Sequence, residues 1–183
     1  MARVSMTEYD TASPEVRAAY EDQIAKNGRI TNMKRTLLHS VPAYHAYMEW
    51  YRLRDEISPF IGERGVVIFS HAISTASHCL ICSTFFRRYL IEAGEDPGQL
   101  VLNEGEQLLV DYGRQLATDS NNVSEELYGR LAATFSEREI LLLTAFAGIM
   151  IATNVLNNAL RVPLDEVLYQ YRDAKQFGEQ HGG

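Results

Sequence analysis

The stretch SEREILLLTAFAGIMIATNVLNNAL, residues 136–160, decides the fold class of this chain. Ser136 followed three residues later by Glu139 is a capping box, the pattern with which many α-helices begin. Apolar residues then cover almost the whole circumference of the helix predicted over 137–160, whereas a surface helix of a small domain keeps one polar face. We therefore expect this helix either in the centre of the core or between subunits, and the second position predicts an oligomer.

Helical signals extend from this stretch through nearly the whole chain. Ser13 is predicted to cap a helix that has Pro14 in its first turn and stops before Gly28. Further helices are predicted by MKRTLLHS, PAYHAYMEWYRLRDEI, GERGVVIFSHAISTAS, CLICSTFFRRYLIEAG, EGEQLLVDYGRQLA and PLDEVLYQYRDAKQF. Alternating polar and apolar runs and Asn-Gly or Asp-Gly turns are absent from the sequence. The sequence therefore predicts an all-α fold.

Length and composition predict one domain over residues 1–183, with a loose tail at 178–183. The chain has 183 residues, of which 46% are hydrophobic, and its net charge of −7 argues against a nucleic-acid partner. The longest apolar run, residues 140–152, is shorter than the ~20 residues of a bilayer span, so no membrane association is expected. The N-terminus lacks the apolar core of a signal peptide, which predicts a cytoplasmic protein.

Cys79 and Cys82 are the two cysteines of the chain, and they form a C-x-x-C pair. In a reducing compartment such a pair is more often catalytic or metal-binding than a structural staple. If Cys79 lies in the first turn of a helix, the backbone N–H groups and the helix dipole favour its thiolate, and the other thiol lies close enough to form a disulfide with it. Ser77 is predicted to cap this helix, which makes His78 and Cys79 its first two residues.

The residues alone leave three interpretations of the pair open: a redox site, a metal site or two small core residues. Only His71, His78, Cys79 and Cys82 form a candidate ligand set, and the chain has no second C-x-x-C or H-x-x-x-H to complete it. We therefore predict no metal and no cofactor. Late in the apolar helix, buried asparagines need partners, so Asn154 or Asn157 is expected to hydrogen-bond across helices or near the thiols.

Several segments, taken in order and spacing, carry a resemblance to a known family. They are SPEVRAAYEDQIAKNGRITNMKRTLLHSVPAY, AISTASHCLICS, LIEAGEDP, LLVDYGRQLATDSNNVSEE and FSEREILLLTAFAGIMIATNVLNNALRVPLD, and the resemblance that they carry runs from about residue 10 to about residue 168. They resemble the alkyl-hydroperoxidase D-like, peroxidase-related branch of the carboxymuconolactone decarboxylase family. The resemblance implies a helical homo-oligomer (dimer, trimer or hexamer) that reduces small-molecule hydroperoxides with electrons from an external dithiol reductant.

The same resemblance implies a role for each site residue. Cys82 is expected to attack the peroxide and Cys79 to resolve the product as a disulfide. The family places a proton-carrying glutamate twelve residues before the first cysteine and a histidine four residues after the second, where this chain has Val67 and Phe86. His71, one helical turn after Val67 and rotated by about 40°, is predicted to act as the base instead.

Two alternatives to a peroxidase follow from the same residues. Without a proton relay, the chain is predicted to be a catalytically degenerate oligomer that binds a ligand or senses redox state. A decarboxylase or isomerase, as in the other branch of the family, is disfavoured because that branch typically lacks the C-x-x-C pair.

Overall fold

The computed structural model describes residues 1–173, and every regular element in that range is a helix. The α-helices are α1 (Pro14–Asn27), α2 (Asn32–Leu37), α3 (Val41–Ala76), α4 (Leu80–Glu92), α5 (Glu104–Asp119), α6 (Glu125–Thr134) and α7 (Glu137–Leu160). Within residues 1–173 there are also three 3₁₀ helices, η1 (Tyr9–Thr11), η2 (Ser120–Asn122) and η3 (Glu166–Tyr171). The predicted all-α fold is confirmed, and the predicted tail at 178–183 lies outside the described residues.

Most helix ends follow their local signals. Ser13 caps α1, which ends at Gly28 in a left-handed conformation, and the capping box of Ser136 and Glu139 opens α7. The helix predicted within PLDEVLYQYRDAKQF was wrong in type, because residues 166–171 form a 3₁₀ helix. The carboxylate of Asp165 does not cap this segment; it accepts a hydrogen bond of 2.9 Å from the backbone N–H of Asn32 instead.

One helix, α6, was missed by the sequence analysis. Ser124 caps it by accepting a hydrogen bond from the N–H of Leu127, and two glutamates occupy its first turn. These are standard helix-start signals. α6 contributes the fully buried Leu131 to the core.

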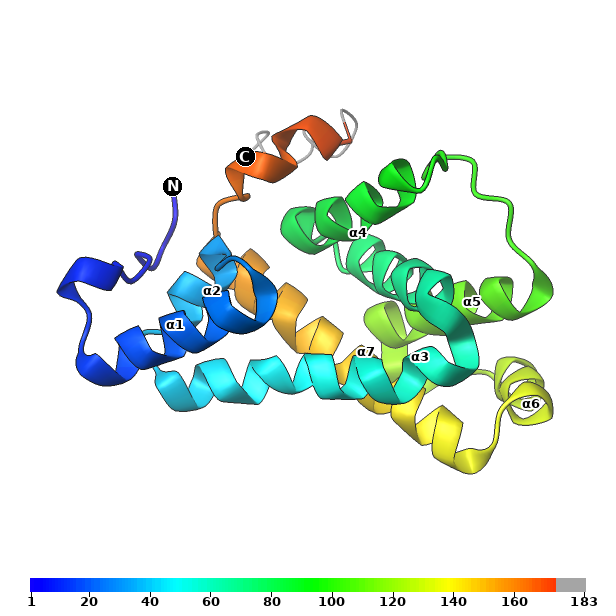
Figure 1. Cartoon of the computed structure of the whole chain (residues 1–183). Coiled ribbons are helices and arrows are strands. Elements are labelled where there is room, and N and C mark those ends of the chain that lie inside the picture. Colours follow the sequence, from blue (N-terminus) through cyan, green and yellow to red (C-terminus); the bar gives the residue numbers. More distant parts are fainter. Residues whose placement is uncertain (174–183) are drawn as a thin grey trace.

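A sharp bend at Gly62 divides α3 into two halves. Gly62 has φ 73° and ψ 163°, a backbone conformation that is essentially restricted to glycine, and Pro59 interrupts the helical hydrogen bonds just before it. After the bend, the second half of α3 turns back toward the middle of the molecule (Figure 1). The two separate helices predicted for this region therefore exist as two arms of one element.

The second arm of α3 forms the centre of the core. It packs against α4, α5 and α7. Phe69, which is fully buried, stacks on Tyr112 of α5 and on Phe146 of α7, with ring centroids 6.4 and 6.0 Å apart. A smaller apolar cluster joins α1 and α2 to the first arm of α3 at the other end of the molecule (Figure 1).

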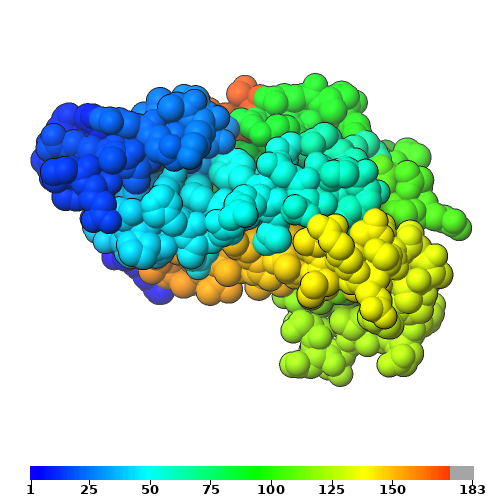
Figure 2. All heavy atoms as spheres, turned by 60° about the horizontal axis from the view of Figure 1, so that its bottom comes forward, coloured from blue at the N-terminus to red at the C-terminus, as the bar shows by residue number. Residues whose placement is uncertain are grey.

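The apolar helix α7 is only partly covered by the rest of the chain. Its buried side contributes Leu143 and Met150 to the core, and 39% of its most apolar window is buried. An apolar stripe on the opposite side is exposed, with Leu141 at 67% and Val155 at 60% exposure, and α7 forms a band along the surface in Figure 2. By length and mean hydropathy (1.9) this helix also meets the criteria for a membrane span, as core helices do.

Candidate active site

The cysteine pair begins a helix immediately after a tight reversal of the chain. At the end of α3, the N–H of His78 donates to the carbonyl of Thr75 and that of Cys79 donates to the carbonyl of Ser74, both at 3.0 Å. This is a Schellman arrangement, and it places His78 in the left-handed region with φ 51°. Ser77 ends α3 and does not cap α4, so that prediction was wrong: the reversal moves the start of α4 two residues further along the chain.

Cys79 is itself the N-cap of α4. Its sulfur accepts a hydrogen bond of 3.5 Å from the backbone N–H of Cys82, and the side chain of Cys79 is 1% exposed. A hydrogen bond from the Cys82 thiol, together with backbone N–H groups, lowers the pKa of Cys79. The same thiol–thiol hydrogen bond, together with burial, raises the pKa of Cys82. The pair therefore loses its first proton from Cys79, and Cys82 keeps its own and donates it to the Cys79 sulfur.

A third side chain, Asn157 of α7, reaches both sulfurs. Its Nδ2 lies 3.3 Å from the Cys82 sulfur and 3.9 Å from the Cys79 sulfur. An amide N–H aimed at a sulfur favours the thiolate over the thiol, and it lowers the pKa of both cysteines. Of the two asparagines singled out from the sequence, only Asn157 has such a contact. Asn154 is fully buried, and its amide has no hydrogen-bond partner within residues 1–173.

Cys82, at 6% exposure, lines a cavity of about 590 Å³ that Cys79 does not line. The wall around Cys82 is apolar and aromatic, with Trp50, Val67, Phe85, Phe86 and Met150. The indole N–H of Trp50 donates to the Met150 sulfur at 2.9 Å, and its ring lies 6.3 Å from that of Phe86. Val67 and Phe86 occupy the two positions where a proton relay was expected, so this wall carries no acid or base at either of them.

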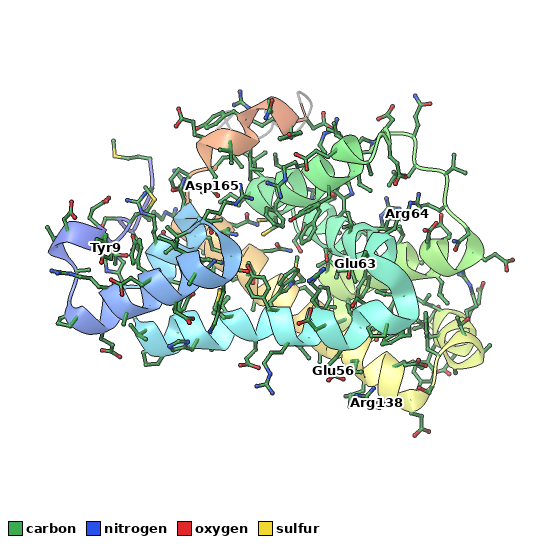
Figure 3. The ribbon with its side chains drawn as sticks, viewed as in Figure 1. Tyr9, Glu56, Glu63, Arg64, Arg138 and Asp165 are labelled. Atoms are coloured by element: carbon green, nitrogen blue, oxygen red, sulfur yellow. The ribbon has the colours of Figure 1, made fainter. Side chains whose placement is uncertain are left out.

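The same cavity has a polar part formed by residues far from the cysteines in sequence. Lys34 of α2, Tyr51 of the first arm of α3 and Asp165 all line it, and Figure 3 shows Asp165 beside α2. Lys34 is 6% exposed, and burial, followed by repulsion from Arg29, lowers its pKa to about 8. Sequence analysis missed Lys34, because its position in MKRTLLHS gives no sign that the fold buries it.

His71 lies outside this cavity. It lines a second, smaller cavity of about 310 Å³ with Arg87 and Arg114, on faces of α3 and α4 that differ from those around Cys82. Burial, followed by repulsion from these two arginines, lowers the pKa of His71 to about 4, so the imidazole is a weak base. The structure brings Cys79 and Cys82 together but does not bring His71 to them.

The four residues of the candidate ligand set are likewise not gathered around one point. His78 is exposed on the reversal before α4, and His71 faces the second cavity. Within residues 1–173, the structure contains no group of three or more His, Cys, Asp or Glu side chains that would hold a metal ion. The arrangement is that of a dithiol of which one thiol, Cys82, faces the apolar wall of the cavity and the other, Cys79, lies behind it.

Comparison with known proteins gives matches among solved structures only: no protein-family model and no curated protein matches this chain. An uncharacterized peroxidase-related protein from Silicibacter sp. TM1040 is 16% identical with a TM-score of 0.71, covering 93% of this chain and 96% of its own. Another, from Ralstonia eutropha JMP134 and described as an alkylhydroperoxidase AhpD core, is 14% identical with a TM-score of 0.71, covering 92% and 94%.

The debrominase Bmp8 has the same architecture. Its apo structure is 17% identical to this chain with a TM-score of 0.74, covering 92% of this chain and 95% of its own. A cysteine-to-alanine variant of Bmp8 in complex with 2,3,4-tribromopyrrole also matches, with a TM-score of 0.75. At these identities the likeness establishes the fold, which is the alkyl-hydroperoxidase D-like fold that the sequence resemblance implied.

Proposed function

We propose that this chain is a thiol-dependent reductase that reduces organic hydroperoxides with Cys82 and Cys79. The observation that supports this proposal best is the position of the pair: Cys82 lines the apolar cavity, and the sulfur of Cys79 lies behind it at the start of α4, hydrogen-bonded to it. The peroxidase-related proteins with the same fold make hydroperoxides the first substrate class to test.

The proposed reaction has two steps. The Cys82 sulfur attacks the terminal oxygen of the hydroperoxide, the O–O bond breaks, and the alkoxide takes a proton from water to leave as the alcohol. Cys82 is now a sulfenic acid. The Cys79 sulfur then attacks the Cys82 sulfur, hydroxide leaves as water with the proton of Cys79, and a disulfide forms. The hydroperoxide gains two electrons and the two thiols lose them.

Cys79 also supplies the base that the chain otherwise lacks near Cys82. Because Cys79 has the lower pKa and accepts the hydrogen bond of the Cys82 thiol, its thiolate takes the Cys82 proton as Cys82 attacks. Asn157 stabilises the negative charge on either sulfur during this transfer. This replaces the role predicted for His71, which is therefore left out of the mechanism.

The cycle closes when an external dithiol reductant returns the disulfide to two thiols. We propose that the reductant is a protein of the cytoplasm, where thiols are kept reduced. The proposed reaction involves no nucleic acid and no membrane.

The test is mass spectrometry of the reduced protein after one equivalent of cumene hydroperoxide. The wild type is expected to lose two hydrogens. Cys79→Ser is expected to give a sulfenic acid that dimedone traps on Cys82, but to form it more slowly than the wild type reacts, because the Cys79 base is gone. Cys82→Ser is expected to give neither product. If both thiols of the wild type stay reduced, the catalytic proposal fails and the degenerate binding or sensing protein is favoured.

A second candidate is reductive removal of bromine from an aromatic ring. The aromatic wall formed by Trp50, Phe85 and Phe86 beside a dithiol favours it, as does the shared fold of Bmp8. In this reaction the two thiols supply two electrons and become a disulfide, the C–Br bond breaks, bromide leaves, and the ring carbon takes a proton. Release of bromide from a bromopyrrole, measured in parallel with cumene hydroperoxide reduction, separates the two candidates.

We also propose that the protein is a homo-oligomer in which a second copy covers the exposed side of α7. The exposed residues Leu141, Ala145, Gly148, Val155 and Ala159 follow one another at spacings of three, four or seven, which places them on one stripe of the helix. Light scattering that gives the mass of a single chain at micromolar concentration would refute this proposal.

A further inference from the structure

Lys34 is a buried cation in the cavity that Cys82 lines, and within residues 1–173 it forms no ion pair. Its Nζ donates one hydrogen bond, to the hydroxyl of Tyr51 at 2.7 Å, and also lies 4.9 Å from the centre of that ring. An ammonium group has three donors, so two of them have no protein acceptor within residues 1–173. Burying a charge without a counter-charge is costly, and an apolar residue at this position would avoid the cost.

The acidic groups along the cavity are held by other partners. The negative charge of Asp165 raises the pKa of Lys34, but its carboxylate is bound elsewhere, by the backbone N–H of Asn32. Glu63, which directly follows the bend of α3 and is labelled in Figure 3, pairs with Arg54 at 2.5 Å. Arg29 lines the cavity near Lys34 and adds positive charge there, since it contributes to lowering the pKa of Lys34. The part of the cavity around Lys34 is therefore set to receive an anion.

A network of neutral side chains holds this group in place. The hydroxyl of Tyr44 donates to Oε1 of Gln23 at 2.9 Å, and Gln23 also hydrogen-bonds the hydroxyl of Tyr51, which accepts from Lys34. Gln23 and Tyr44 are both buried. A lysine fixed in this way differs from a surface lysine, whose side chain samples many rotamers and is fully hydrated.

We infer that the substrate carries a carboxylate or similar acidic group, which Lys34 binds while the apolar body lies against Trp50 and Phe86 and its reactive atom meets Cys82. The inference depends on the proposed function only for the role of Cys82 as the reacting group. The predicted binding mode depends on the cavity itself, which combines an apolar wall and one buried cation. Lys34 is thus a specificity residue, and it is contributed by a helix that carries none of the thiol chemistry.

Binding can be tested without turnover, because Trp50 is the single tryptophan of the chain and lines the cavity. The probes are 4-phenylbutanoate and its neutral isostere 4-phenylbutanamide, titrated against the reduced protein while Trp50 emission is recorded. The wild type is expected to bind the carboxylate at least tenfold more tightly than the amide. In Lys34→Gln that preference is expected to disappear while amide binding remains. Lys26→Gln, which removes the same charge from the exposed face of α1, is expected to keep the preference.

A pH titration of the wild type tests the same inference without a variant. As the pH rises through and beyond about 8, Lys34 loses its proton and carboxylate affinity should fall, while amide affinity stays level. Equal affinity for the two probes in the wild type, or an unchanged preference in a folded Lys34→Gln, would overturn the inference. These readouts need no oxidation, so they separate a failure here from a failure of the thiol chemistry.

Discussion

The two cavities of this molecule use different faces of the same two helices and have opposite characters. The larger cavity combines an aromatic wall, the Cys82 thiol and Lys34, whereas the smaller one combines His71 with Arg87 and Arg114. Each contains one basic side chain whose pKa burial lowers, to about 8 for the buried Lys34 and to about 4 for the half-buried His71. At neutral pH the first is charged and the second is neutral, so the two cavities are suited to different partners.

This contrast shows why helical spacing alone did not place the base. Val67 and His71 are one turn apart on α3 and differ by about 40° around its axis. Val67 nevertheless lines the larger cavity and His71 the smaller one. The difference of about 40° is thus enough to place the two side chains on opposite sides of the boundary between the cavities. A one-turn displacement along a helix is therefore a substantial change in environment.

The largest expected effect comes from removing the charge of the larger cavity. At pH 7 the buried ammonium of Lys34 opposes folding, so Lys34→Met is expected to raise the free energy of unfolding by about 2 to 3 kcal/mol. The pKa of Lys34 is lower in the folded protein than in the unfolded chain. The wild type therefore becomes more stable as the pH rises from about 8 toward 10.5, and Lys34→Met does not show this gain. Urea unfolding at pH 7 and pH 9.5 measures both effects, with Lys26→Met as the exposed control. If Lys34→Met were less stable than the wild type at pH 7, the claim that the buried charge opposes folding would be wrong.

The corresponding change in the smaller cavity acts at acidic pH. The pKa of His71 is also lower in the folded protein than in the unfolded chain. The stability that the neutral imidazole provides above pH 6.5 is therefore lost as the pH falls toward 4. We expect the wild type to lose about 2 kcal/mol more than His71→Gln over this range, measured by urea unfolding. The rate of disulfide formation should be the same in both proteins. A slower rate in His71→Gln would restore His71 as the base.

The two cavities depend differently on the bend at Gly62. Residues from both arms of α3 line the larger cavity, whereas from α3 only the second arm lines the smaller one. Gly62→Ala is expected to lower the free energy of unfolding by about 2 kcal/mol. No atom lies within 4 Å of the added methyl group, so the effect arises from the backbone conformation alone. Thermal unfolding measures the loss. An unchanged stability would mean that the bend is not strained by a side chain.

The smallest expected effect compares two asparagines on α7. Asn157→Leu removes the amide that contacts both sulfurs and should slow disulfide formation about tenfold, equivalent to about 1.4 kcal/mol. Asn154→Leu is the matched control, and its rate should stay at the wild-type value. Stopped-flow oxidation with cumene hydroperoxide gives both rates, and equal rates in the two variants would remove Asn157 from the site.

Much of the fold was predictable because its signals are local. The capping box at Ser136, the cap at Ser13 and the stop at Gly28 each depend on a few neighbouring residues, and all three were confirmed. The errors had two sources. A distant partner misled at Asp165, which hydrogen-bonds Asn32 rather than capping the residues after it. At α4 the local backbone decided, because the Schellman reversal at His78 moved the N-cap from Ser77 to Cys79, so that the helix begins at Leu80.

The sequence by itself determined the helical class and identified two thiols close enough to bond, since periodicity and a three-residue separation are local properties. Tertiary structure alone decided which thiol lines the cavity, that Asn157 is the amide that contacts the sulfurs, and that a lysine 48 positions before Cys82 lines the same cavity. These outcomes depend on how helices pack. Burial and the pKa of a side chain are set by neighbours that the order of residues along the chain does not reveal.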